Sequence, residues 1–172
     1  GAGTFLPVKS SLVSEHTMHR EPFVITLDFL EKLRSRSGKL VAVGTTSVRT
    51  LESLYYIGVR CIESGVPGDV DQWDPYCRKY EYSLDESLGA LIDYLKDNSL
   101  NELQLGTRII IVPGYEFKVV DVLVTNFHQP QSTLLLLISA FVKGDWHKIY
   151  DFALANDFRF LSYGDSSLLF KE

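Results

Sequence analysis

The chain of 172 residues has the length of about one domain, and its 45% hydrophobic content excludes disorder of the whole chain. The formal net charge of −5 excludes a broad, non-specific grip on nucleic acid, which needs a basic surface, although a local basic patch is compatible with it. The two cysteines, Cys61 and Cys77, are too few for a disulfide framework and indicate a reducing, cytoplasmic compartment. The longest apolar run, 134–140, is too short to span a bilayer, so we expect no membrane partner. The chain begins with Gly1 and its only methionine is Met18, so we expect it to be a piece of a longer protein.

The first part of the chain alternates strand and helix signals. Gly38 follows the first apolar stripe of helical spacing and predicts a helix end. Thr46 or Ser47 can cap the next helix. In order we expect a loop and short strand at 1–8, a strand at 21–26, a helix at 27–37, a strand at 40–43 and a helix starting at 46–47.

The middle of the chain is less regular. Glycines and prolines without a clear period predict an irregular connection over 61–82. Ser83 and Glu86 form a capping-box pattern ahead of a leucine stripe, which predicts a helix over 84–96. The polar stretch 98–104 is expected to be a linker.

The last part again alternates strands and helices. We expect strands at 108–112 and 117–124 around a turn at 113–114, a buried helix at 132–142, an amphipathic helix at 145–156, and short strands at 158–161 and 167–170. Strands that alternate with helices predict an α/β fold, a three-layer sandwich with a mainly parallel sheet.

Polar side chains follow two apolar strand candidates, at the point where each strand ends. Thr125, Asn126, Phe127 and His128 follow one of them, and Ser132 opens the next helix. Asn and His beside an aromatic ring can bind a planar base by stacking and edge hydrogen bonds, and His128 can act as an acid or base. The alternative is a capping and turn motif with Phe127 in the core. A site at the carboxyl ends of sheet strands is therefore predicted.

The other strand end carries Thr45, Thr46 and Ser47, after a glycine. Three hydroxyls at a helix N-terminus form a cradle for an anion or a ribose, and Arg49 adds a fork for a carboxylate. The alternative is a capped helix with a surface ion pair between Arg49 and Glu52.

Two shorter motifs also attract attention. His16, His19 and Glu21 have a spacing that would suit a metal, hydrogen bonds to hydroxyls or an amine, or simply a solvated loop. The stretch 162–165, with Tyr163 and Asp165, is either a plain turn or part of a site.

Taken together, these segments resemble the S-adenosylmethionine:tRNA ribosyltransferase-isomerases, a family of queuosine-pathway enzymes. The matches run in order over nearly the whole chain, which makes them far more specific than any one motif. They are Gly1-Ala2-Gly3-Thr4-Phe5 with Pro7-Val8, His16-x-Met18-His19-x-Glu21, Val43-Gly44-Thr45-Thr46-Ser47-Val48-Arg49-x-Leu51-Glu52-Ser53, Pro113-Gly114-Tyr115-x-Phe117-Lys118-Val119-Val120-Asp121, Thr125-Asn126-Phe127-His128-x-Pro130-x-Ser132-Thr133-Leu134 and Phe158-Arg159-Phe160-x-Ser162-Tyr163-Gly164-Asp165.

The resemblance implies transfer of the ribosyl part of S-adenosylmethionine to an aminomethyl-deazaguanine base at the tRNA wobble position. The unit is isomerised to epoxyqueuosine, adenine and methionine are released, and no metal or resident cofactor is expected. As hypotheses, His19 or His128 is the catalytic base, and His128 with Asn126 meets adenine. Arg49 meets the methionyl carboxylate, and Glu21 or Asp165 meets ribose hydroxyls. The full set of expected substrate-binding residues is His16, Glu21, Thr45, Thr46, Ser47, Arg49, Thr125, Asn126, Phe127, Ser132, Tyr163 and Asp165.

The chain also departs from the family pattern. Family members are about twice as long, so residues 1–172 would be the C-terminal part of the α/β catalytic domain of a larger two-domain enzyme, inactive alone, with the missing N-terminal half as a partner. The stretch 62–105, an irregular connection plus a helix, is a candidate insertion. Two alternatives stay open: a non-catalytic nucleoside or nucleic-acid binding module of the same fold, and a metal-dependent hydrolase using His16, His19 and His128.

Overall fold

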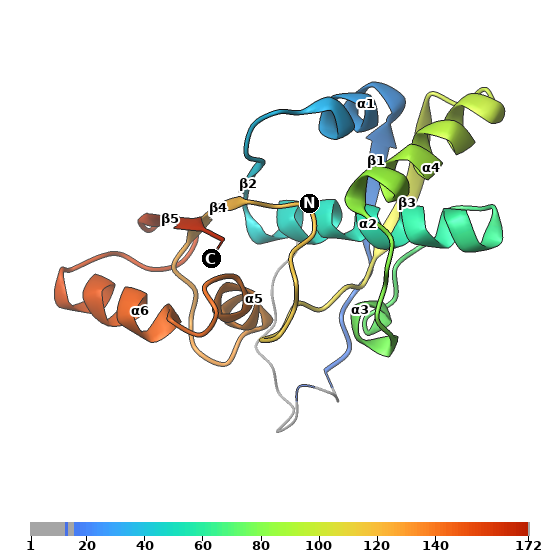
Figure 1. Cartoon of the computed structure of the whole chain (residues 1–172). Helices are drawn as coiled ribbons and strands as arrows, with labels where there is room; N and C mark the ends of the chain where they lie inside the picture. Colours follow the sequence, from blue (N-terminus) through green and yellow to red (C-terminus); the bar gives the residue numbers. More distant parts are fainter. Residues whose placement is uncertain (1–12, 14–15, 172) are drawn as a thin grey trace. The chain divides into compact units, whose positions relative to one another are not determined.

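The computed structural model describes residue 13 and residues 16–171, and it divides into two compact units (Figure 1). The first unit takes its described residues from Gly1–Thr17, Leu40–Val48 and Ile110–Glu172. The second unit consists of Met18–Lys39 and Arg49–Ile109. The expected loop and strand at 1–8 lie outside the described residues.

The second unit is built on a two-stranded antiparallel sheet of β1 (Glu21–Thr26) and β3 (Glu102–Thr107). Strand β1 leads directly into α1 (Leu27–Ser35), where Thr26 caps the helix by accepting a hydrogen bond from the Phe29 N–H. Helix α4 (Leu84–Asp97) packs beside α1, and its apolar stripe of Leu88, Leu91 and Leu95 is fully buried. This unit also holds the short α3 (Asp74–Cys77) and most of α2 (Thr45–Ser64).

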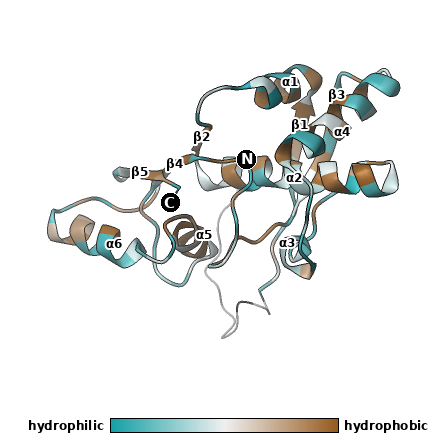
Figure 2. Ribbon diagram, in the orientation of Figure 1, coloured by the Kyte–Doolittle hydropathy of each residue, from teal (hydrophilic) through white to brown (hydrophobic). Residues whose placement is uncertain are grey.

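The first unit contains a three-stranded sheet in the order β2 (Val41–Val43), β4 (Val122–Asn126), β5 (Ser166–Phe170). Helices α5 (Thr133–Phe141) and α6 (Trp146–Ala155) follow β4 in the chain. Helix α5 is buried, and it is apolar almost all round, as its brown colour in Figure 2 shows.

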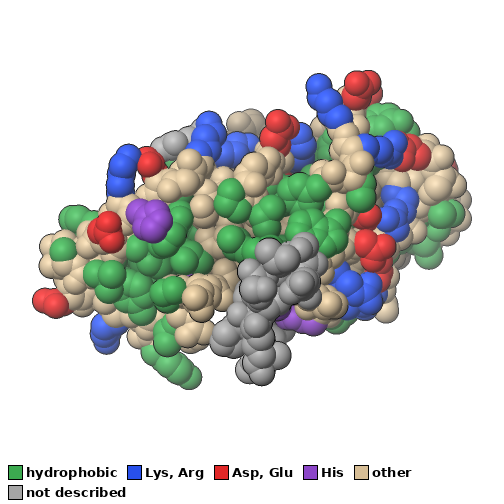
Figure 3. Space-filling view, turned by 90° about the horizontal axis from the view of Figure 1, so that it is seen from below, with side chains coloured by type: hydrophobic (Ala, Val, Ile, Leu, Met, Phe, Trp, Pro, Cys, Tyr) green, Lys and Arg blue, Asp and Glu red, His purple; other side chains and the backbone are tan. Residues whose placement is uncertain are grey.

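The two faces of this sheet differ in burial. Ala42, Leu123 and Leu169 lie in register on one face and are buried. The side chains of alternate positions point to the other face. There Val41, Val43, Leu168 and Phe170 are exposed, and we call these four residues the open apolar face. Hydrophobic side chains also reach the surface elsewhere, and Figure 3 shows broad hydrophobic patches with charged side chains mainly along two margins of that view.

The mixed α/β class is confirmed, but the expectation of one mainly parallel sheet is wrong. Among the described strand pairs, β2 and β4 run parallel, whereas β1 with β3 and β4 with β5 run antiparallel. Strand β5 is antiparallel because the chain turns back at residues 161–165 and returns along β4. The strands form two small sheets rather than the central sheet of a three-layer sandwich.

Several boundaries were predicted correctly and others were not. Strand β1 has the predicted bounds, and α4 begins with the predicted capping box of Ser83 and Glu86. Helix α2 continues to Ser64, past the expected break at 61, and the expected linker at 98–104 contains the start of β3. Neither 108–112 nor 158–161 forms a strand. Their apolar residues are used for packing instead, and Ile109, Ile110 and Ile111 are buried.

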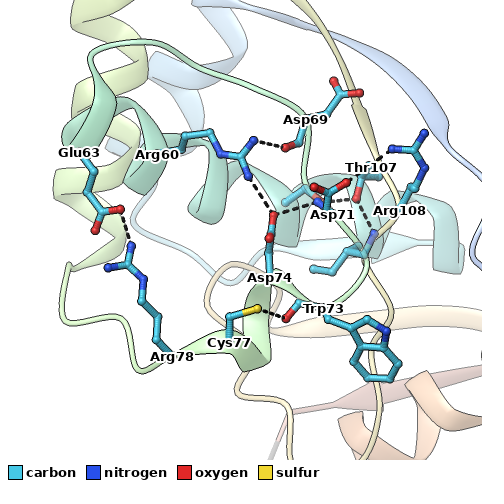
Figure 4. A network of polar contacts seen from close by, with 12 residues as sticks. Arg60, Glu63, Asp69, Asp71, Trp73, Asp74, Cys77, Arg78, Thr107 and Arg108 are labelled. Atoms are coloured by element: carbon cyan, nitrogen blue, oxygen red, sulfur yellow. Dashed lines mark hydrogen bonds and ion pairs between the residues drawn. The ribbon is translucent and has the colours of Figure 1, made fainter. Parts of the chain in front are cut away.

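The segment 62–105, expected to be an irregular connection plus a helix, is more ordered than that. Its loop between α2 and α4 is held by a network of arginines and acidic residues (Figure 4). Arg60 donates to the Asp69 carbonyl (2.7 Å) and to the Asp74 carboxylate (3.0 Å), and Asp69 also accepts from the Gly106 N–H (2.7 Å). The hydrogen bonds from Arg20 lower the pKa of Asp69. None of the described helices is both long and apolar enough to cross a membrane.

Candidate active site

A pocket of about 540 Å³ lies in the first unit, at the carboxyl ends of the parallel strands β2 and β4. Both strands lead into helices there, so the N-termini of α2 and α5 meet the same cavity. This position and size are typical of ligand sites in α/β proteins, and the pocket lies where the two predicted polar strand ends meet. The lining residues are Val43, Gly44, Thr45, Thr46, Ser47, Thr125, Asn126, His128, Gln129, Ser132, Leu134, Leu161 and Ser162.

The first turn of α2 presents donors to this pocket. The helix's hydrogen bonding starts with the Val48 N–H, which donates to the Gly44 carbonyl (3.3 Å), so the N–H groups of Thr45, Thr46 and Ser47 precede it. The Ser47 hydroxyl donates to the Val43 carbonyl (2.8 Å). The first turn carries no acidic residue, so its partial positive charge is not offset there. This helix end therefore suits an anionic or electron-rich ligand group.

Helix α5 begins at the pocket with its own cap. The Ser132 hydroxyl accepts from the Leu135 N–H (3.2 Å) and donates to the Gln129 carbonyl (2.9 Å). The predicted substrate-binding residue Ser132 is thus also the N-cap of α5 and fixes the loop that carries His128.

His128 is half-buried between β4 and α6. Its Nε2 lies 3.0 Å from the Thr125 Oγ1, and its backbone N–H donates to the Tyr150 hydroxyl (3.0 Å). Burial lowers the pKa of His128 from 6.5 to about 4. The imidazole is therefore neutral at pH 7, with one ring nitrogen able to donate and the other able to accept a hydrogen bond.

Asn126 ends β4 and connects it to the turn before β5. Its side-chain amide lies 3.4 Å from the carbonyl oxygens of Gly164 and Asp165 and from the Ser166 hydroxyl. The Asp165 carboxylate accepts from the Arg159 N–H (2.7 Å), and residues 162–165 form a turn. Tyr163, at the tip of this turn, is 97% exposed.

Phe127 points away from the solvent. It is 3% exposed and packs edge-on against Tyr150 and Phe158, with Phe160 tilted against it. The ring is the centre of an aromatic cluster that supports the loop with Asn126 and His128. This placement agrees with the predicted alternative of Phe127 in the core.

A second cluster lies in the second unit and joins His19, Glu21 and Arg49. Arg49 is 2% exposed and donates to Glu21 (2.7 Å) and to the Ile109 carbonyl (2.9 Å), while the exposed His19 has its Nε2 3.4 Å from Glu21. Arg49 Nη2 and Glu21 Oε2 are buried without a hydrogen bond. Burial lowers the pKa of Arg49, and the Glu21 carboxylate partly offsets this effect. The expected surface pair of Arg49 with Glu52 is wrong, because both residues are buried and Arg49 pairs with Glu21.

The structure thus gathers Thr45, Thr46, Ser47, Thr125, Asn126, His128 and Ser132 at one pocket. Within residues 16–171, no group of three His, Cys, Asp or Glu side chains could hold a metal ion, so the metal-dependent hydrolase finds no ligand set there.

Sequence reasoning missed Leu161 and Gln129 as lining residues. Nothing in the sequence pointed to Tyr150 as the partner of His128, because the two are 22 residues apart.

Comparison with known proteins decides the family. Residues 1–169, almost the whole chain, match the model of the family described as queuosine biosynthesis protein. The chain belongs to this family.

Individual queuosine biosynthesis relatives agree. The S-adenosylmethionine:tRNA ribosyltransferase-isomerases of Caulobacter vibrioides and Rickettsia bellii are 42% and 36% identical over 176 residues, and each alignment covers 100% of this chain. The crystal structure of S-adenosylmethionine tRNA ribosyltransferase from Thermotoga maritima is similar with a TM-score of 0.56 and 33% identity, covering 86% of this chain and 40% of that one. The chain spans only 37–38% of the length of the two curated relatives.

Proposed function

We propose that this chain is part of an S-adenosylmethionine:tRNA ribosyltransferase-isomerase and that the first-unit pocket binds S-adenosylmethionine. The supporting observation is a cavity at the carboxyl ends of β2 and β4 that combines a neutral imidazole with two helix N-termini. The reaction transfers the ribosyl unit to the deazaguanine base at the tRNA wobble position, isomerises it to epoxyqueuosine, and releases adenine and methionine. Since the chain spans 37–38% of the length of its relatives, we expect it to be inactive alone.

In the pocket, His128 and Asn126 are the proposed contacts of the adenine ring. A neutral imidazole can donate to a ring nitrogen of adenine, and this hydrogen bond strengthens as negative charge develops on the leaving base. Thr125 holds the imidazole at its Nε2, so the ring is already oriented before the ligand binds. The hydroxyls and N–H groups of Thr45, Thr46 and Ser47 are the proposed partners of the ribose oxygens.

Of the two candidate bases for removal of the proton beside the sulfonium, His19 suits the role better than His128. A group whose pKa is about 4 is a weak base at neutral pH, which disfavours His128. His19 is exposed and has a carboxylate, Glu21, beside its Nε2, which orients the ring. In the same unit, Arg49 is proposed for a substrate carboxylate, because a guanidinium can form two parallel hydrogen bonds to a carboxylate.

Two macromolecular partners belong to this proposal. The first is the tRNA that carries the deazaguanine precursor. The second is the remainder of the enzyme, for which the open apolar face of the β2-β4-β5 sheet is a suitable docking surface. A sheet face of valine, leucine and phenylalanine side chains gains free energy when another layer covers it.

Calorimetric titration with S-adenosylmethionine tests the pocket. We expect saturable binding to this chain that is weakened about tenfold or more by His128→Ala and by Asn126→Ala, since each removes a hydrogen bond to the ligand. His147→Ala is the matched control, because His147 is exposed on α6 and does not line the pocket. Equal binding by the wild type and by both pocket variants would contradict the proposed site.

A further inference from the structure

The turn at residues 161–165 places one aromatic ring almost entirely in water, directly after two residues that line the pocket. Leu161 and Ser162 line the cavity, and Tyr163 follows them with 97% of its surface exposed. An aromatic ring normally buries most of its surface, so a ring kept in solvent beside a ligand pocket calls for an explanation.

This turn is fixed in place by its own contacts. The Leu161 N–H donates to the Phe127 carbonyl (2.9 Å), and the Asp165 carboxylate and N–H both bond the Arg159 backbone (2.7 and 2.8 Å). At Gly164 a Cβ atom would lie 2.2 Å from the Arg159 carbonyl oxygen, so the chain comes closer here than any other residue type allows. The ring of Tyr163 is therefore presented from a constrained support.

The turn also contains backbone strain. Leu161 has φ of +71°, in the left-handed region that a branched side chain rarely adopts. Strained conformations persist where the surrounding structure enforces them, and they cluster at ligand sites. Leu161 and Ser162 both line the pocket, and Tyr163, the next residue, is the one exposed to solvent.

We propose that Tyr163 is a stacking platform for an unpaired nucleobase of the RNA substrate, next to the base that is modified at the pocket. This inference rests on the proposed function. Single-stranded RNA loops are recognised by stacking of exposed bases on aromatic rings. The chain has a net charge of −5, so stacking has to supply part of an affinity that a basic surface does not provide. Arg159 lies just before this turn with an exposed guanidinium 3.8 Å from the Asp165 carboxylate, and it can meet the adjacent phosphate.

Fluorescence anisotropy of a labelled anticodon stem–loop RNA, with the deazaguanine precursor at the wobble position, tests this proposal. We expect Tyr163→Ala to weaken RNA binding about 5- to 150-fold, the range for loss of one stacked base, and Tyr163→Phe to bind like the wild type. Gly164→Ala, which displaces the turn, should weaken binding as well. The matched control is Phe152→Ala, another exposed aromatic residue of the first unit that does not line the pocket.

The outcomes separate this inference from the proposed function. Unchanged RNA affinity in Tyr163→Ala, or equal losses in Tyr163→Ala and Phe152→Ala, overturns the stacking role, and so does a wild-type chain that binds no RNA. If Tyr163→Ala binds RNA like the wild type, the Tyr163 ring would instead be a contact for another polypeptide. S-adenosylmethionine binding, measured separately, should be the same in Tyr163→Ala and in the wild type; its absence in the wild type would be the failure of the proposed function itself.

Discussion

The Nε2 atom of His128 lies 3.0 Å from the Oγ1 atom of Thr125, three residues earlier in the chain. The backbone N–H of the same histidine donates to Tyr150, so the residue is held at its ring and at its main chain. Burial of the imidazole lowers the pKa of His128 to about 4 and makes it a neutral hydrogen-bonding group rather than a charged one.

Stability should depend on pH through His128. The pKa of His128 falls from 6.5 to about 4 on folding. Between pH 6.5 and pH 4 this histidine is therefore protonated in the unfolded chain and neutral in the folded chain. The free energy of unfolding is unaffected above pH 6.5 and decreases as the pH falls toward 4. We expect a loss of roughly 1 to 2 kcal/mol at pH 5 relative to pH 7.5, allowing for partial solvent exposure. Urea unfolding at both pH values measures it. This loss of stability should disappear in His128→Gln and persist in His147→Gln. A loss of the same size in His128→Gln would show that another group causes it.

Replacing one member of the Glu21–Arg49 pair should lower stability strongly, whereas replacing both members should lower it much less. Removing either partner leaves the other charge buried and unpaired, so Glu21→Leu and Arg49→Met should each lower stability by about 3–5 kcal/mol. The double variant should lose clearly less than the sum of the two. Chemical denaturation of all four proteins measures the coupling, and additive losses would show that the pair does not act as a unit.

Gly58 should be irreplaceable because α2 and α4 approach each other at this point. A Cβ on Gly58 would lie 2.1 Å from Ser87 Oγ and 2.2 Å from its carbonyl oxygen, and Ser87 is itself bonded to the Tyr55 carbonyl (2.6 Å). We expect Gly58→Ala to destabilise by about 1–3 kcal/mol, despite the higher helix propensity of alanine. Gly38→Ala, where a Cβ meets no atom within 4 Å, is the control and should stay within about 0.5 kcal/mol in thermal unfolding. A Gly58→Ala protein as stable as the wild type would mean that the two helices can separate freely.

The capping box of α4 should contribute measurably to stability. The Ser83 hydroxyl accepts from the Glu86 N–H (3.2 Å), and the Glu86 carboxylate accepts from the Ser83 N–H (2.7 Å). Ser83→Ala is expected to cost about 1 kcal/mol in urea unfolding. Ser37→Ala, at an exposed serine before β2, should be nearly neutral. Equal effects of the two substitutions would argue against the cap.

The features that were predicted correctly from the sequence depend on residues close together in the chain. The bounds of β1, the capping box at Ser83 and the polar strand ends at Thr45 and Thr125 are all local signals, and the structure confirms each of them. Parallel strand ends meet at one edge of a sheet, so two such ends sufficed to locate the pocket.

Strand pairing between segments far apart in the chain could not be predicted from the sequence. The alternation of Glu102, Leu103, Gln104 and Leu105 fits a half-exposed strand, but its polar residues suggested a linker. The strand forms because β1 pairs with it across 76 to 86 residues of sequence. Conversely, the run Ile109 to Ile111 has strand composition, yet it packs as extended core without strand pairing of its own. The burial of Arg49 and the low pKa of His128 likewise come from segments distant in the chain.

The left-handed backbone of Leu161 carries an evolutionary consequence. A glycine at this position would relieve about 1 kcal/mol of strain, so a laboratory population selected only for thermal stability should lose the leucine early. A population selected for ligand binding at the pocket should keep it, because Leu161 forms part of the pocket wall. The identity of residue 161 after many generations would therefore record which of the two pressures had acted.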